Sequence, residues 1–124
     1  MVELRGVSFG YQSDKNVLDN LNLRMEEGRF YGLLGMNGSG KTTLLKLIAG
    51  KLFAHGGEIY VDGRNLRERD VETLQKVFML PADFIFPNMS LEQFLAIYSE
   101  FYPEFRKEVL NDWSILKYSG ILRI

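Results

Sequence analysis

The first quarter of the chain alternates between apolar and polar residues. The alternation runs over residues 2–9 and returns from Leu21 to Met25. A period of two is typical of a strand that buries one face and exposes the other. Turn-forming residues lie between the two segments at 12–16 and after the second segment at 26–29. We therefore expect two strands, over 2–9 and 17–25, that pair antiparallel and lead into the next part of the chain.

The following segment changes its pattern along its length. Residues 30–34 are a short apolar run typical of a strand, whereas residues 44–49 are helix formers that end at Gly50. Between them, residues 35–43 (Gly-Met-Asn-Gly-Ser-Gly-Lys-Thr-Thr) match the pattern G-x-x-x-x-G-K-[ST]. We expect a phosphate-binding loop between a strand and a helix. The alternative is a glycine-rich turn without a ligand, which is less favoured because the eight-residue pattern seldom arises by chance.

This motif supplies the groups that a polyphosphate needs. Its glycines leave backbone N–H groups open, and the first turn of the helix adds further amides. Lys41, the candidate catalytic residue, is expected to reach the β- and γ-phosphates of a nucleotide, and the Thr42 hydroxyl to hold Mg²⁺. The residues predicted to bind the nucleotide in this loop are Gly35, Asn37, Gly38, Ser39, Gly40, Lys41, Thr42 and Thr43.

Further strands are expected behind this helix. Residues 58–61 (Glu-Ile-Tyr-Val) follow two glycines and precede Asp62 and Gly63, which are typical of a tight turn. The charged residues 64–70 predict a surface connection. Residues 77–80 (Val-Phe-Met-Leu) predict a second buried strand, which Pro81 ends.

From Ser90 onward the apolar residues recur at helical spacing. Ser90 and Gln93 have the spacing of a capping box, so a helix should begin directly after Ser90. A second helix is expected from Pro103 to about residue 117. The stripe of the first helix favours a core position over a partner-binding face. Its members are Leu91, Phe94, Leu95, Tyr98, Phe101 and Tyr102.

Composition excludes several classes of protein. The 124 residues are 46% hydrophobic and 25% charged, with a net charge of −1 and no cysteine. This balance is that of a globular domain and offers no basic surface for nucleic acid. Disulfides and thiolate metal sites are excluded. The chain contains no apolar run long enough to span a bilayer and no secretory signal at its start.

Four stretches together resemble the ATP-binding subunit of ABC transporters, over its N-terminal half. They are residues 7–11 (Val-Ser-Phe-Gly-Tyr), 17–23 (Val-Leu-Asp-Asn-Leu-Asn-Leu), the loop at 35–43 and 57–63 (Gly-Glu-Ile-Tyr-Val-Asp-Gly). The resemblance implies an α/β P-loop NTPase of ABC type, with an antiparallel β subdomain, a partial parallel sheet and helices. It implies one partial domain that stops before the second half of the family's domain. Residues 1–80 would form the β subdomain and P-loop core, and 81–118 the start of the helical subdomain.

The resemblance also implies ligands and partners. An aromatic residue at the position of Tyr11 stacks on adenine in this family, and Val17 would pack against the same ring. Tyr11 could instead be a surface tyrosine, and Val17 a core residue. ATP and Mg²⁺ would be the cofactors. The partners would be a membrane-domain subunit and a second ATPase subunit, arranged head to tail, on the cytoplasmic face of the plasma membrane.

The sequence departs from the family in ways that bear on hydrolysis. Ala82 stands where the family usually has a glutamine, and Asp83 could replace that glutamine or simply cap the loop. The family's Leu-Ser-Gly-Gly-Gln signature, Asp-Glu pair and switch histidine are absent from the 124 residues. Asp62 ends a strand as the family's metal-binding aspartate does, but a glycine follows it and a tight turn explains it better. His55 lies upstream of the position of the family's switch histidine and is better explained as a solvated loop residue. We expect a chain that binds ATP but cannot hydrolyse it alone.

Two alternatives stay open. A non-catalytic nucleotide-binding module, either a degenerate pseudo-ATPase or a regulator, is favoured by Ala82. A small P-loop kinase would need an arginine-rich lid, and Arg64, Arg67 and Arg69 match such a lid only weakly. The solute and the direction of transport cannot be inferred from these residues.

Overall fold

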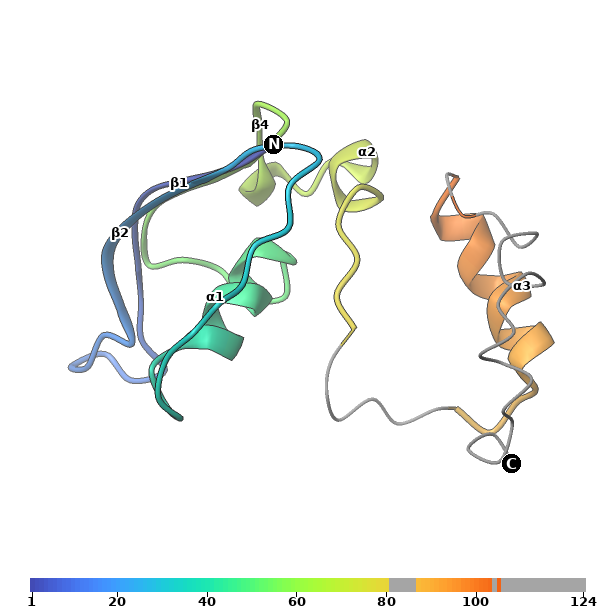
Figure 1. The fold of residues 1–124 in the computed structure, drawn as a ribbon, viewed down its shortest axis with the longest axis horizontal. Helices are drawn as coiled ribbons and strands as arrows, with labels where there is room; N and C mark the ends of the chain where they lie inside the picture. The colour runs from blue at the N-terminus through green and yellow to red at the C-terminus, as the bar shows by residue number, and fades with distance from the viewer. Residues whose placement is uncertain (81–86, 104, 106–124) are drawn as a thin grey trace. The chain divides into compact units, whose positions relative to one another are not determined.

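A computed structural model describes residues 1–80, 87–103 and 105 of the chain (Figure 1). The chain divides into two compact units, Met1–Pro81 and Ala82–Ile124, which are described separately. The two positions of interest at 82 and 83 lie outside the described residues, as does almost all of the helix expected over 103–117.

The first unit contains a four-stranded antiparallel sheet with the order β2-β1-β3-β4. The central strand β1 pairs on one side with β2 and on the other with β3. Leu4 of β1, for example, lies between Leu23 of β2 and Ile59 of β3. The antiparallel pair predicted from the alternating pattern is thus confirmed. The strands are β1 (Val2–Phe9), β2 (Leu18–Met25), β3 (Gly56–Val61) and β4 (Arg64–Asn65).

One face of this sheet packs against the helix that follows the glycine-rich motif. That helix, α1 (Lys41–Ile48), contributes Leu44 and Leu47 to the core, and Figure 1 shows it beside the sheet. The core residues of the strands and of the segment after β4 are all 6% exposed or less. They are Leu4, Val7, Phe9, Ile59, Val61 and Leu66. This packing fixes the start of α1 relative to β1.

The connection after β3 is more ordered than the sequence predicted. Asp62, with a φ of 50°, and Gly63 form the expected two-residue turn into β4. A 3-10 turn, η1 (Leu66–Glu68), and a short helix, α2 (Val71–Leu74), follow. The charged residues predicted as a surface connection over 64–70 are mostly exposed, but Leu66 is 5% exposed and belongs to the core.

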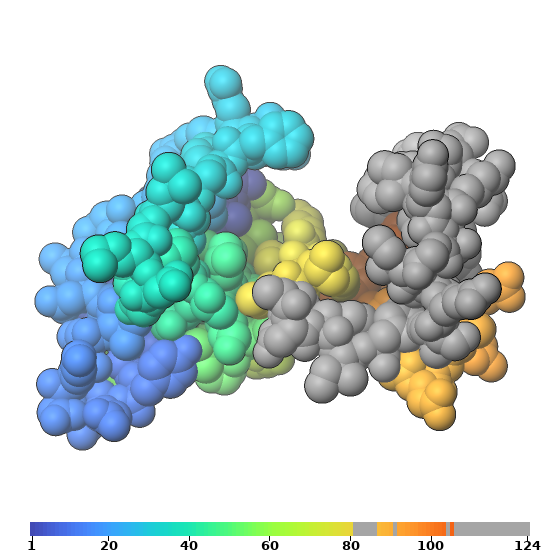
Figure 2. All heavy atoms as spheres, turned by 60° about the horizontal axis from the view of Figure 1, so that its bottom comes forward, coloured from blue at the N-terminus to red at the C-terminus, as the bar shows by residue number. Residues whose placement is uncertain are grey.

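The strand predicted over 30–34 is not formed. Those residues have no regular secondary structure, and the side chain of Leu34 is 94% exposed. Figure 2 shows this cyan part of the chain at the surface of the unit. An apolar strand needs hydrogen-bonded neighbours and a covered face, and no described strand pairs with this segment.

The prediction of a strand over 77–80 was also wrong. Residues 77–80 lack strand structure, and the side chains of Phe78 and Leu80 are 58% and 72% exposed. The expected partial parallel sheet is therefore absent from the described residues, where every strand pair is antiparallel. No strand of the described residues pairs with either segment, and a strand is stable only beside a hydrogen-bonded neighbour.

The second unit contains α3 (Leu91–Phe101). The Gln93 amide donates to the Ser90 hydroxyl and the Gln93 side chain accepts from the Ser90 amide, which confirms the predicted capping box. Of the described side chains of the apolar stripe none is fully buried: Phe101 is 61% exposed and the others are half-buried. Within the stripe, Phe94 and Tyr98 stack with ring centroids 4.1 Å apart. None of the described helices is long and apolar enough to cross a membrane.

Candidate nucleotide-binding site

The glycine-rich loop ends directly at the first residue of α1. Gly40 is the N-cap of this helix and has a left-handed backbone with a φ of 91°. Its carbonyl accepts the first helical hydrogen bond, from the Leu44 amide at 2.8 Å. The Ser39 amide donates to the Met36 carbonyl at 3.2 Å, which closes a tight turn within the loop. Of the predicted strand-to-helix arrangement, the structure thus forms the helix and the loop but not the strand.

The start of α1 has the chemistry of an anion site. Its cap residue carries no side chain and therefore supplies no capping oxygen, and the first turn contains no acidic residue. The first amides of a helix have no acceptor within the helix and carry a partial positive charge. A negatively charged group placed at this end would meet open donors and no carboxylate of the first turn.

Lys41 places a positive charge inside the loop. Its ammonium donates to the carbonyl oxygens of Gly35 at 2.6 Å and Met36 at 2.7 Å, and reaches the Ser39 hydroxyl at 3.5 Å. The side chain thus folds back over the loop that precedes it. The residues between these contacts, Asn37 and Gly38, are exposed. The contact of Lys41 with the Met36 carbonyl could not be predicted from the sequence, because every residue provides a backbone oxygen.

Gly40 is held against the chain that leads into β2. A Cβ at this position would lie 3.0 Å from Cγ1 of Val17 and 3.1 Å from Cδ2 of Leu18. The Val17 amide donates to the Phe9 carbonyl at 2.7 Å, which fixes this segment to the end of β1. The structure therefore brings half-buried Val17 to the start of α1. Leu18 was not singled out from the sequence.

Tyr11 lies over the same end of the helix. Its hydroxyl is 3.1 Å from the Thr43 hydroxyl, and either oxygen can be the donor. The Tyr11 ring meets the Phe9 ring edge to face, with centroids 5.1 Å apart. Tyr11 is 62% exposed, whereas Thr43 is only 5% exposed. An exposed aromatic face and the phosphate-type loop thus share one end of α1.

Thr42 is the candidate magnesium ligand, and its side chain is exposed in the first turn of α1. In the described residues, no three His, Cys, Asp or Glu side chains are grouped so that they could hold a metal ion. Mg²⁺ commonly takes few protein ligands and completes its shell with phosphate oxygens and water. A single hydroxyl beside a candidate phosphate site fits that chemistry.

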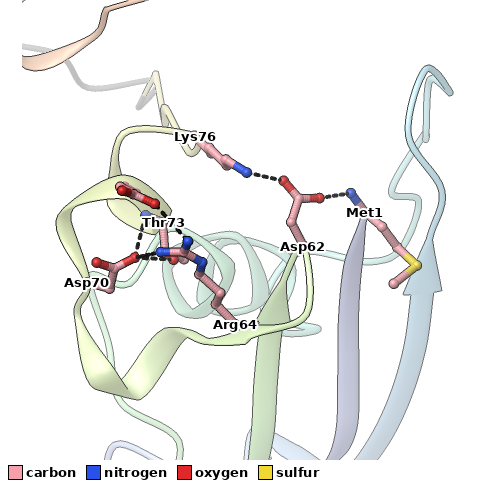
Figure 3. A network of polar contacts seen from close by, with 7 residues as sticks. Met1, Asp62, Arg64, Asp70, Thr73 and Lys76 are labelled. Carbon is pink, nitrogen blue, oxygen red and sulfur yellow. Dashed lines mark hydrogen bonds and ion pairs between the residues drawn. The ribbon is translucent and has the colours of Figure 1, made fainter.

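Asp62 has a structural role. Its carboxylate accepts from the Lys76 ammonium at 2.8 Å and from the N-terminal amine of Met1 at 2.5 Å (Figure 3). These two hydrogen bonds lower the pKa of Asp62 to about 2 from an ordinary value of 3.8. The two carboxylate oxygens of Asp62 thus connect the β3–β4 turn to the start of the chain before β1 and to Lys76, which lies two residues after α2.

Arg64 and Arg69, two of the three arginines considered for a kinase lid, also make contacts within the fold. Arg64 pairs with Asp70 at 2.6 Å and with Glu72 at 2.7 Å, as Figure 3 shows for the labelled Asp70. Arg69 donates to the Gly50 carbonyl at 3.1 Å, and its guanidinium lies over the Phe53 ring. These contacts stabilise the segment after β4 and give the lid interpretation no support.

His55 directly precedes β3 and lies 12 positions after the glycine-rich motif in the sequence. It is exposed, its ring centroid lies 5.0 Å from that of Phe9, and its amide donates to the Ser8 carbonyl at 2.9 Å. A cavity of about 480 Å³, which includes space open to solvent, lies nearby at the other end of α1. No residue of the 35–43 loop lines this cavity. Its lining includes Leu47, Gly50, Phe53, Ile59, Asn65 and Leu66.

Comparison with known proteins agrees with this geometry. The family model described as ABC transporter matches residues 18–120. A solved ATP-binding subunit of an ABC transporter shares the fold, with a TM-score of 0.77 at 24% identity over 94% of this chain and 48% of that one. A putative ABC transporter ATP-binding protein from Pyrococcus furiosus has 34% identity and a TM-score of 0.71, over 90% and 54% of the two chains.

A third structure is an ATP-binding cassette, solved as a dimer in a post-hydrolysis state with ADP and Pi bound. It has 34% identity and a TM-score of 0.53, over 61% of this chain and 34% of that one. The chain spans about half the length, or less, of these matching structures. The family match covers most of its residues, and the loop, the helix and the antiparallel sheet are in place. The chain therefore belongs to the ABC transporter family and forms part of its ATP-binding domain.

Proposed function

We propose that this chain binds ATP through the loop at residues 35–43, as part of the ATP-binding subunit of an ABC transporter. The observation that carries the proposal is the position of the Lys41 ammonium. It lies inside a glycine-rich loop, bonded to the Gly35 and Met36 carbonyls, at a helix start whose cap has no side chain. A cation and open amides at one point form a site for a polyphosphate.

The other residues of the site have separate roles in this proposal. The exposed ring of Tyr11 would stack on adenine, since an aromatic face binds a base without reading its edge. Val17 supports the start of α1 and would extend the same apolar surface. The Thr42 hydroxyl would hold Mg²⁺, which neutralises charge between the β- and γ-phosphates when it is bound.

Hydrolysis of ATP needs more groups than binding of ATP does. It needs a group that orients water and donors for the transition-state charge, in addition to the phosphate site. The chain supplies Lys41 and the amides of α1, while the family's signature, Asp-Glu pair and switch histidine are absent from its sequence. We propose that this chain alone binds ATP without turning it over. Ala82 is the observation that favours the alternative of a non-catalytic nucleotide-binding module.

The proposed partners follow from the family. A second ATPase subunit, head to tail, would complete the site, and a related cassette was solved as a dimer. A membrane-domain subunit would face the helical segment after Asp83, and ATP would drive transport through that subunit. The place of action would then be the cytoplasmic face of the plasma membrane.

The test is ATP binding to the 124-residue chain by isothermal titration calorimetry, with Mg²⁺ and then with EDTA. Lys41→Ala should weaken ATP binding at least tenfold, because the main positive charge of the loop is lost. Lys46→Ala is the matched control, since it removes the same charge from the last turn of the same helix. It should change the affinity less than twofold, and EDTA should weaken binding to the unaltered chain.

Two results would count against this function. Equal ATP affinity in Lys41→Ala and the unaltered chain would remove the phosphate-binding assignment. Steady-state release of phosphate from ATP by the unaltered chain, lost in Lys41→Ala, would show that the chain hydrolyses ATP alone. Binding without turnover is the expected result.

A further inference from the structure

The exposed ring of Tyr11 is held in place by a residue of the phosphate loop. Its hydroxyl lies 3.1 Å from the hydroxyl of Thr43, which follows Lys41 and Thr42 in the first turn of α1. The two residues are 32 positions apart in the sequence. Thr43 is 95% buried, so its oxygen is fixed by the core packing of α1. One end of the Tyr11 side chain is therefore attached to the rigid start of the helix.

A second contact fixes the plane of the ring. Phe9, which is 5% exposed, meets the Tyr11 ring edge to face at an angle of 88° between the ring planes. With its hydroxyl bonded and its ring packed against Phe9, the Tyr11 ring cannot turn freely, although 62% of the residue remains exposed. A ring ordered before binding loses less side-chain entropy when a base stacks on it.

We propose that Thr43 is a positioning residue for the base: its hydroxyl holds the Tyr11 ring at a fixed place relative to the phosphate loop and so raises the affinity for nucleotides with a large aromatic base. The inference rests on the proposed function, in which Tyr11 contacts adenine. It assigns the Thr43 hydroxyl to Tyr11, whereas the sequence assigned Thr43 only to the nucleotide itself. The buried threonine thus links base recognition to the helix that binds phosphate.

The experiment compares ATP with inorganic tripolyphosphate, which has the phosphates without the base. Both ligands are titrated with Mg²⁺ against the unaltered chain, Tyr11→Phe, Thr43→Val and the double variant. Either single change removes one hydroxyl and keeps the shape of the side chain. Each should weaken ATP binding about three- to tenfold, the range expected when one side chain must be ordered on binding. Each should also lower the ratio of ATP affinity to tripolyphosphate affinity.

Two further observations separate positioning from general damage to the loop. The double variant should bind ATP no more weakly than the weaker single variant, because both changes remove the same contact. Thr43→Ser keeps the hydroxyl and should restore the affinity ratio to within twofold of the unaltered chain. Thermal unfolding of each variant, followed by circular dichroism, checks that it is folded. Tyr11→Phe and Thr43→Ser carry the test if Thr43→Val does not fold.

Three outcomes would overturn the inference. The first is an additive loss in the double variant. The second is an equal weakening of ATP and tripolyphosphate by Thr43→Val, which would assign Thr43 to the phosphates. The third is unchanged ATP affinity in Tyr11→Phe together with a clear loss in Tyr11→Ala, which overturns the positioning role but keeps the base contact. Unchanged affinity in Tyr11→Ala would instead remove the base contact from the proposed function, and the positioning role with it.

Discussion

Gly40 shows how much a single position contributes to this site. It caps α1 with a left-handed backbone, and its missing side chain lets the helix start lie against Val17 and Leu18. Both properties are needed at once, because L-residues rarely adopt this conformation and a Cβ would crowd two apolar side chains. The glycine that the phosphate motif requires is therefore also a packing residue between α1 and the chain entering β2.

We predict that Gly40→Ala destabilises the chain by more than Gly38→Ala. Gly38 has a similar φ of 83°, but nothing lies within 4 Å of a Cβ built there. Gly38→Ala should cost about 1–2 kcal/mol for the left-handed backbone alone. Gly40→Ala carries that cost and the contact with Val17 Cγ1 at 3.0 Å. Urea unfolding of the two variants measures the difference.

A second measurement isolates the contact. Introduced into a Val17→Ala background, Gly40→Ala should cost less than in the unaltered chain, because part of the crowding side chain is gone. Equal losses in Gly40→Ala and Gly38→Ala, with no relief from Val17→Ala, would show that the packing contact has no energetic weight.

At the scale of elements, the structure of residues 30–34 differs from the buried strand that their apolar sequence predicts. Its composition is that of a strand buried on both faces, yet Phe30 and Leu34 are almost fully exposed. Tyr31 is held by a hydrogen bond from the Glu26 amide to its hydroxyl at 2.7 Å, which is a local turn contact. Apolar residues exposed in this way lack the burial that would stabilise them.

We predict that Leu34→Ala changes the stability of the chain by no more than about 0.5 kcal/mol, as exposed substitutions usually do. Leu4→Ala is the matched comparison, since it makes the same chemical change at a residue that is 2% exposed in β1. It should cost about 2–5 kcal/mol through lost burial and the cavity left behind. Chemical denaturation of both variants is the measurement, and a similar loss in both would mean that residue 34 is buried.

At the scale of the whole first unit, Asp62 joins three parts of the chain that are distant in sequence. One oxygen bonds the N-terminal amine at the start of β1, and the other bonds Lys76 after α2 (Figure 3). The Asp62 amide adds a backbone hydrogen bond to the Met1 carbonyl at 2.8 Å. The side chain is 37% exposed, so solvent and salt weaken these ion pairs.

We predict an acid-dependent part of the stability that disappears in Asp62→Asn. The pKa of Asp62 is about 2 in the folded chain, below its ordinary 3.8. Stability from this group is therefore full above about pH 5 and is lost as the pH falls from about 4 through 2. The unaltered chain should be more stable than Asp62→Asn at pH 7, and the difference should shrink toward zero near pH 2.

Urea unfolding at several pH values between 7 and 2 is the measurement for this prediction. Asp14→Asn is the control, because it makes the same charge change at an exposed residue in the turn between β1 and β2. It should leave the acid dependence of the unaltered chain in place. A constant difference between the unaltered chain and Asp62→Asn across this range would contradict the proposed linkage.

Much of the fold could be predicted because its causes are local. The alternation in β1 and β2, the turn at Asp62, the cap at Ser90 and the loop before α1 depend on residues only a few positions apart. The positions of Tyr11 and Val17 beside the loop follow the spacing that the sequence offered. Their roles toward a nucleotide stay predictions.

The strands expected over 30–34 and 77–80 show the limit of such prediction. A strand is stable only with a hydrogen-bonded neighbour, and a residue's own segment does not reveal whether that neighbour is present. The buried position of Leu66 likewise depends on packing against distant elements, although its neighbours in the sequence are charged.

The sequence alone therefore determined the family, the glycine-rich loop before α1, the pair β1 and β2 and the capped start of α3, because each rests on short-range spacing and hydrogen bonding. Only the tertiary structure decided that residues 30–34 are exposed, that Gly40 meets Val17 and that Tyr11 is bonded to Thr43. These features depend on contacts between segments far apart in the chain, and the packing of α1 on the antiparallel sheet brings those segments together.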